Sequence, residues 1–169
     1  KLARENPERP LYCRGIPLRP AAMAVGAPSC DTPCKFFRQG QQIHDTDQWK
    51  MRGDIFYDGS CIQRRDDVLT RAAWAAVEVD KQGNETARLT GPVWRDLPQT
   101  AQAAEYTAWA TAVMLLDGPT TLYGDCLNVV RDAKAPDDTA LKRTKMHAGI
   151  ILGARKSGNL HHVVDNIWV

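Results

Sequence analysis

The sequence is short of the features that would place it in a special class of protein. No apolar run approaches the roughly 18 residues that a membrane-spanning helix needs, so we expect no membrane partner. The first residues, beginning at Lys1, contain no apolar core of the signal-peptide type. The five cysteines are an odd number, so they cannot all pair within one chain. These absences favour an intracellular location, cytoplasmic or nuclear.

Charge of one sign is also scarce. Lys and Arg number 22 and Asp and Glu number 20, which leaves a formal net charge of +2. Charge alone therefore does not indicate a nucleic-acid partner. The hydrophobic fraction of 43% and the charged fraction of 25% are ordinary for a chain of 169 residues that folds around one core. An assignment of function has to come from motifs.

Proline is concentrated in the first part of the chain. Residues 1–50 contain six prolines and many charged residues, with little apolar periodicity and no repeat. Such a composition is typical of a linker. We therefore predict a proline-rich linker or arm at residues 1–50, partly disordered, and a folded domain at residues 51–169.

Apolar periodicity in the second part predicts the order of the elements. We expect three strands, a helix, a strand, two helices and a final strand, at residues 54–61, 72–80, 85–93, 100–116, 120–124, 127–133, 142–154 and 161–169. Thr100 is a good N-cap for the first helix, and Gly118-Pro119 is expected to end it. Consecutive strands favour an antiparallel meander, whereas strands separated by helices favour parallel pairing. The predicted fold class is α/β, with a mixed sheet and flanking helices.

Three acidic residues stand at informative positions in this pattern. Asp58 lies in or at the end of the first strand, Glu105 lies on the first helix, and Asp125 follows the fourth strand. Each has an alternative structural explanation: a turn for Asp58, an N-cap for Asp125 and the edge of the apolar stripe for Glu105. Burying an ionised carboxylate without a partner is costly. On an apolar stripe, Glu105 is therefore expected to protonate, pair with a cation or bind metal.

Taken together, the three carboxylates predict a metal site. If the first and fourth strands are neighbours, Asp58 and Asp125 lie side by side and Glu105 reaches them from the helix that covers the sheet. Like charges at that density require a cation, and oxygen ligands favour Mg²⁺ or Mn²⁺. Two such ions about 4 Å apart support an in-line displacement at a phosphodiester. The expected chemistry is phosphoryl transfer.

The same segments resemble the ribonuclease H family. Its three central motifs are matched by YDGSC at 57–61, QTAQAAEYTAWATAVMLL at 99–116 and LYGDCLNVV at 122–130, with the acidic residues in the family's order. The resemblance covers about residues 54–169. It implies a ribonuclease H-like five-stranded mixed sheet, an antiparallel meander plus parallel strands, with flanking helices. It also implies a metal-dependent endonuclease that hydrolyses the RNA strand of an RNA/DNA hybrid with two Mg²⁺ or Mn²⁺ ions.

The resemblance further implies roles for individual residues. The catalytic residues and metal ligands would be Asp58, Glu105 and Asp125. Substrate binding would fall to Gly59, Ser60, Gln102 and Asn128. Arg143 and Lys145 are further substrate-binding candidates, which rest on their basic side chains and not on the resemblance. Asn128 is an indirect match, because the position expected to be polar holds Leu127. Arg143 and Lys145 lie on the predicted helix at 142–154, where they would neutralise phosphates, although such groups are individually more often a solvated surface.

The sequence departs from the family at its end. The family continues past its fifth strand with a His-bearing loop and a last helix that supplies a fourth carboxylate, whereas this sequence stops at Val169. We therefore expect a C-terminally truncated domain with the last helix missing. Together with a first residue other than Met, this indicates a fragment of a longer protein. A linker in front fits a retroelement polyprotein that contains a reverse transcriptase.

Two alternative functions can be compared with the same sequence pattern. An integrase or transposase of related fold has its acidic residues in the order Asp, Asp, Glu, with the last on a late helix, and the order in this sequence argues against it. A catalytically inactive ribonuclease H-like module, which binds nucleic acid or acts as a spacer in a larger protein, has no such conflict. Metal binding separates an active domain from the inactive module.

Overall fold

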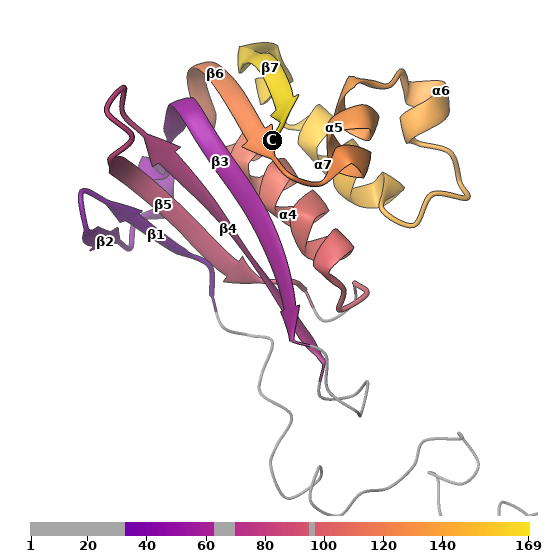
Figure 1. Ribbon diagram of the computed structural model, residues 1–169, viewed down its shortest axis with the longest axis horizontal. Coiled ribbons are helices and arrows are strands. Elements are labelled where there is room, and N and C mark those ends of the chain that lie inside the picture. The colour runs from indigo at the N-terminus through magenta and orange to yellow at the C-terminus, as the bar shows by residue number, and fades with distance from the viewer. Residues whose placement is uncertain (1–32, 63–69, 95–96) are drawn as a thin grey trace, which may run out of the picture.

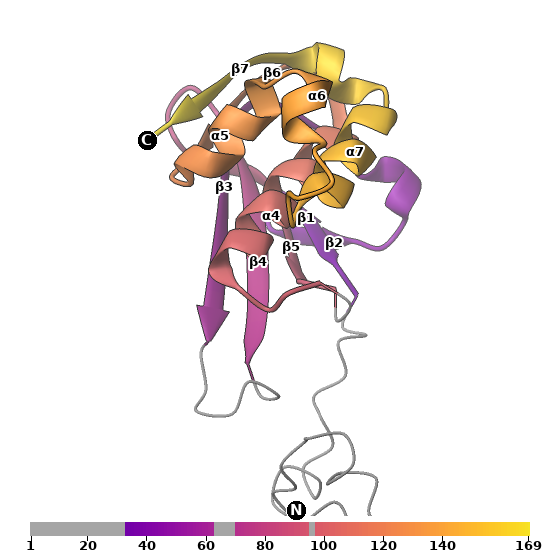
Figure 2. The ribbon, with the colours of Figure 1, turned by 90° about the vertical axis from the view of Figure 1, so that its right-hand side faces the viewer.

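A computed structural model describes residues 33–62, 70–94 and 97–169, in which α-helices gather on one face of a mixed sheet (Figures 1 and 2). The strands are β1 (Lys35–Arg38), β2 (Gln41–Ile43), β3 (Met51–Ile62), β4 (Arg71–Val79), β5 (Glu85–Pro92), β6 (Leu116–Gly124) and β7 (Val163–Trp168). The helices are α4 (Ala101–Met114), α5 (Leu127–Lys134), α6 (Asp137–Ala140) and α7 (Ala148–Lys156), with short 3-10 helices η1 (Thr46–Gln48) and η3 (Asn159–His162). None of these helices has the length and apolar composition needed to cross a membrane.

The sheet combines an antiparallel meander with parallel strands. Its spatial order is β2-β1-β5-β4-β3-β6-β7. Strands β3, β4 and β5 pair antiparallel as successive hairpins, whereas β6 pairs parallel with β3, and β7 pairs parallel with β6. Each parallel connection runs through helices, as such connections require. The predicted α/β class with a mixed sheet and flanking helices is confirmed.

The sheet is larger than the five strands that we expected. Strands β1 and β2 lie in residues 35–43, within the predicted linker at 1–50, so the folded domain begins earlier than predicted. Phe36 explains why they join the sheet: its side chain is fully buried and stacks on Trp49. Two strands of four and three residues are too short to show a period in the sequence. The linker prediction for residues 1–32 lies outside the described residues.

Two predicted helix boundaries were wrong. Helix α4 ends at Met114, and Gly118-Pro119 lies inside β6 instead of ending the helix. The β3–β6 register shifts between Met51 and Gly53, and proline is tolerated in a strand where pairing is irregular. Helix α7 begins at Ala148, six residues later than expected, because residues 142–147 form turns.

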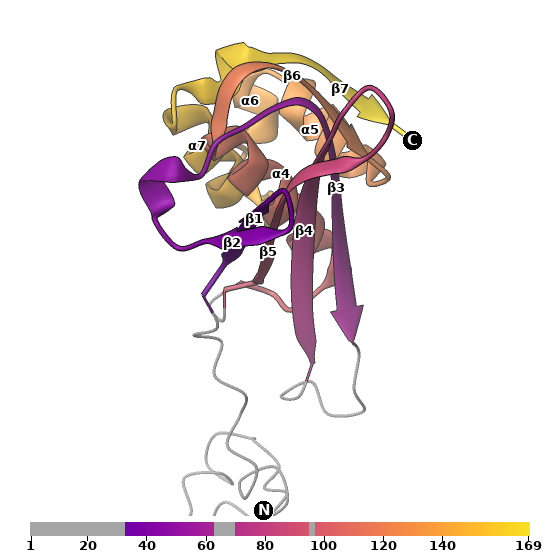
Figure 3. The same cartoon turned by 90° about the vertical axis from the view of Figure 1, so that its left-hand side faces the viewer.

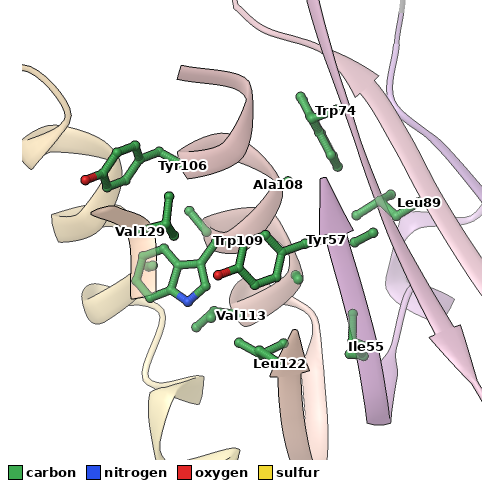
Figure 4. Packing of buried hydrophobic residues seen from close by; sticks show 14 of the residues in the cluster. Ile55, Tyr57, Trp74, Leu89, Tyr106, Ala108, Trp109, Val113, Leu122 and Val129 are labelled. Carbon is green, nitrogen blue, oxygen red and sulfur yellow. The ribbon is translucent and has the colours of Figure 1, made fainter. Parts of the chain in front are cut away.

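Helix α4 is buried between the sheet and the later helices. Its N-cap Thr100 accepts a hydrogen bond from the Ala103 amide (3.1 Å), which satisfies one of the free amides at the start of the helix. Eight consecutive residues, 103–110, are buried, and most of them are small. Trp109 fills the space between α4 and its neighbours (Figure 4). This close packing positions residues of α4 directly against β3.

Candidate metal centre

Three carboxylates from three separate elements converge at one end of the parallel strands. Phe56 of β3 pairs with Tyr123 of β6, and Asp58 and Asp125 each lie two residues farther along. Since the strands are parallel, this register carries both acidic residues to the same place. Glu105 reaches them from the second turn of α4, and one ligand oxygen of each carboxylate lies within 4.8 Å of the others. The convergence that the sequence predicted is therefore present.

Gly59 lets α4 approach the site closely. A Cβ atom at this position would lie 2.3 Å from the Glu105 backbone nitrogen and 2.6 Å from the Ala104 carbonyl carbon, so no other residue fits without moving the helix. The Gly59 amide donates a hydrogen bond to Glu105 Oε1 (2.9 Å). Glycine at this position therefore couples β3 to the ligand on the helix, a role that the sequence analysis did not assign to it.

Gly124 has an equivalent role between β3 and β6. A Cβ atom there would lie 2.2 Å from Cζ of Tyr57, so the aromatic ring rests on the glycine backbone. The Tyr57 hydroxyl donates to Asn166 Oδ1 on β7 (3.2 Å). Tyr57 and Gly124 are the residues immediately before Asp58 and Asp125, so this contact fixes the two strands just ahead of both ligands.

The end of β7 braces the loop that carries Asp125. Trp168 Nε1–H donates to the Asp125 carbonyl oxygen (2.9 Å), and the Val169 amide donates to the Gly124 carbonyl oxygen (3.2 Å). Sequence reasoning did not identify these partners. The sequence signal near these ligands is the glycine next to each of them, Gly59 beside Asp58 and Gly124 beside Asp125. The contact with β7 has no such signal, because the register between β6 and β7 cannot be read from the sequence of one strand.

The electrostatic environment of Glu105 favours a bound cation. Its side chain is 6% exposed, whereas Asp58 and Asp125 are exposed. Burial, followed by the charges of Asp125 and Asp58, raises the pKa of Glu105 to about 8, although the Gly59 amide opposes this shift. Glu105 Oε2 is buried and has no hydrogen-bond partner among the described residues. An all-oxygen donor set with one unpartnered buried oxygen fits a hard divalent cation such as Mg²⁺ or Mn²⁺.

The polar residues expected to contact substrate lie within three residues of a carboxylate in the sequence. Ser60 lies two residues beyond Asp58 on β3, and its side chain is exposed. Gln102 is exposed in the first turn of α4, and Asn128 is exposed in the first turn of α5. All three are accessible to a large ligand, and their roles stay predictions.

The expected basic pair is arranged differently. Neither Arg143 nor Lys145 lies on a helix, since both fall in the turns before α7. Arg143 is exposed, but Lys145 forms an ion pair with the buried Asp132 of α5. The sequence could not show this pairing, because Asp132 and Lys145 come from separate segments. Lys145 is therefore engaged in holding its turn against α5.

Comparison with known proteins identifies the fold. No protein-family model and no curated protein matches the sequence. Among solved structures, the ribonuclease H domain of prototype foamy virus matches 71% of this chain and 79% of its own, at 17% identity and a TM-score of 0.54. The foamy viral protease-reverse transcriptase in complex with an RNA/DNA hybrid matches 79% of this chain at 14% identity and a TM-score of 0.54, and the match covers 20% of that longer chain. The chain therefore has a ribonuclease H-like fold, as its motifs predicted.

Proposed function

We propose that this chain is a metal-dependent endonuclease domain that hydrolyses the RNA strand of RNA/DNA hybrids. The observation that carries the proposal is the convergence of Asp58, Glu105 and Asp125, in which one oxygen of the buried Glu105 has no hydrogen-bond partner in the described part of the chain. The fold supports the proposal, because similar structures include a ribonuclease H domain and a reverse transcriptase in complex with an RNA/DNA hybrid.

The three carboxylates would hold two Mg²⁺ or Mn²⁺ ions. Ions bound there supply an activated water and stabilise charge on the leaving oxygen of a phosphodiester. Asp58 and Asp125 are exposed and would face the substrate. The Glu105 carboxylate is oriented by the hydrogen bond that its Oε1 accepts from the Gly59 amide. Burial of Glu105 excludes water from one side of the site, which strengthens the interaction of its charge with a cation.

Substrate recognition would depend on shape and not on base sequence. Ser60, Gln102 and Asn128 are exposed polar residues within three positions of a carboxylate in the sequence, and Arg143 is an exposed positive charge. Such groups contact phosphates and 2′-hydroxyls, which present the A-form geometry of a hybrid regardless of its bases. We expect cleavage with little sequence preference.

Cleavage of a labelled RNA/DNA hybrid in Mg²⁺ or Mn²⁺ tests the proposal. Asp58→Asn should lower the cleavage rate by at least about a hundredfold, because it removes a charged ligand at the reacting centre. Asp54→Asn is the matched control: Asp54 lies on the same strand four residues earlier, where its carboxylate accepts a hydrogen bond from Tyr123 (3.4 Å), and cleavage should be unchanged.

Metal binding distinguishes the nuclease from an inactive module. Mg²⁺ or Mn²⁺ should raise the Tm of the protein, and Glu105→Gln should remove that increase. A Tm that is the same with and without either metal, together with no cleavage, would contradict the proposal and favour an inactive module of the same fold.

We also propose that the domain works within a longer polypeptide that contains a reverse transcriptase, since the foamy viral proteins are matched over about a fifth of their length.

A further inference from the structure

A row of four side chains crosses the sheet from the carboxylates to β1. Asp58 pairs with Ala75 on β4, Ala75 pairs with Thr90 on β5, and Thr90 pairs with Lys35 on β1. Residues directly opposite each other on neighbouring strands point to the same face of a sheet. Three strand spacings of about 4.8 Å make this row roughly 14 Å long. Asp58 and Lys35 are therefore the two ends of one line of side chains.

The row lies on the face of the sheet turned away from the helices. Tyr57, Trp74 and Leu89, the neighbours of row residues along their strands, are buried on the helix side (Figure 4). Helix α4 covers that side, and Figure 3 shows β1, β5 and β4 in front of it. Within the described residues, the helices therefore leave the row uncovered.

A trough follows this row. It has a volume of about 470 Å³, and its lining includes the four row residues and the parallel row of Ser60, Ala73 and Pro92. Ala73 and Ala75 give it a floor of small side chains. Besides the Asp58 carboxylate, its lining includes the hydroxyls of Ser60 and Thr90 and the exposed ammonium group of Lys35. This surface allows a ligand backbone to approach closely while offering donors along its path.

Charge in the trough is restricted to its two ends. Asp58 and Lys35 are the charged residues of its described lining. Arg88, another cation on these strands, interacts with Glu85 (3.6 Å) and with the ring of Phe37 (4.9 Å). If Asp58 holds a divalent cation, both ends of the trough become positive. A polyanion fits that arrangement.

We propose that the trough binds the continuation of the nucleic-acid strand whose phosphate lies at the metal centre. This inference rests on the proposed function. The strand runs across β3, β4, β5 and β1, with one phosphate at the carboxylate site and a later phosphate at Lys35. The row of roughly 14 Å exceeds the rise of about 3.4 Å per nucleotide along a duplex strand, so its two ends meet different phosphates. Strand β1, absent from the sequence prediction, supplies the distal contact.

Fluorescence anisotropy of a labelled RNA/DNA hybrid in Mg²⁺ tests the distal contact. The full chain carries Glu105→Gln, which removes metal binding and cleavage together, so that the measurement isolates the distal contact at Lys35. Lys35→Gln should weaken binding about fivefold and make the slope of log K against log [salt] shallower by about 0.9, the value for one phosphate contact. Lys81→Gln removes the same charge from the exposed turn after β4 and should change neither quantity. Equal affinities and slopes for the two variants would overturn the proposal.

Filling the trough provides an independent test. Ala75→Phe places a large side chain on its floor, and aromatic residues are favoured in strands, so the fold should persist with an unchanged Tm. Val79→Phe is the matched control on the same strand, opposite Asp54 and away from the trough. Weaker hybrid binding by Ala75→Phe alone supports the trough, even if the wild-type chain does not cleave. If the wild type cleaves the hybrid and both variants bind it equally well, the proposal for the trough is contradicted and the proposed nuclease function is not.

Discussion

Two buried carboxylates close together in the fold have opposite surroundings. Glu105 and Asp132 are 6% and 8% exposed. Asp132 accepts a hydrogen bond from Tyr106 (2.6 Å), the residue next to Glu105, and forms an ion pair with Lys145. Glu105 has one amide donor at Oε1, and Oε2 has no partner among the described residues. The comparison teaches that burial of a carboxylate does not by itself indicate the candidate metal site. The distinguishing feature of Glu105 is burial without a cationic side chain as partner among the described residues.

Glu78 on β4 supports this distinction. It is 6% exposed and completes the set of buried acidic residues in the described chain. Its carboxylate accepts hydrogen bonds from the Arg52 amide (3.0 Å) and the Thr86 hydroxyl (2.7 Å), and Arg38 lies 3.7 Å away. Glu78 and Asp132 therefore have their partners within the fold, whereas Glu105 Oε2 has none among the described residues.

The largest difference should appear when each acid is replaced by its amide. Asp132→Asn should lower the free energy of unfolding by about 2 kcal/mol, because Lys145 loses its charged partner. Glu105→Gln should raise the free energy of unfolding of the metal-free protein, because it removes the cost of burying a carboxyl group that ionises in the unfolded chain and, to a lesser extent, the repulsion from Asp125 and Asp58. Urea denaturation in EDTA measures both. A lower free energy of unfolding in both variants would contradict the difference between Asp132 and Glu105.

The pH dependence of stability should separate Glu105 from the other buried carboxylates. Burial and the neighbouring Asp125 and Asp58 raise the pKa of Glu105 from 4.5 to about 8 in the folded state. Between these values the folded protein keeps a proton that the unfolded chain has lost, so the stability of the metal-free protein should fall as pH rises through this window and level off above it. Urea midpoints measured in EDTA across the window should show this slope in the wild type. A wild-type curve parallel to that of Glu105→Gln would contradict the assignment.

The smallest effect should come from the hydrogen bond that Trp168 donates to the Asp125 carbonyl oxygen. Trp168→Phe removes the donor to the Asp125 carbonyl oxygen while keeping an aromatic ring, and the indole is 57% exposed, so the core is undisturbed. We expect about a threefold increase in the Mg²⁺ concentration that gives half of the Tm increase, below the tenfold typical for partners of metal ligands. Trp94→Phe, at a 69% exposed position in the groove between α4 and α7, is the control. Identical metal dependence of the two variants would show that Trp168 does not position the ligand.

The sequence was informative where a property is local. The N-cap at Thr100, the strand that carries Asp58 and the turn after Val79 follow from residue types within a few positions of each other. Boundaries failed where distant pairing decides them. Leu116 continues the apolar stripe of α4, yet it starts β6, because pairing with Met51 in the sheet outweighs the helical pattern.

The sequence by itself determined the three carboxylates, their order and the elements that carry them, because an acidic residue on an apolar stripe or at a strand end is visible in one segment. Only the tertiary structure decided which buried acid lacks a cation. Lys145 neutralises Asp132 and not a phosphate, and Lys35 aligns with Asp58, through contacts between segments far apart in the chain. Sheet register and close packing set such contacts, and neither is encoded in a single stretch of residues.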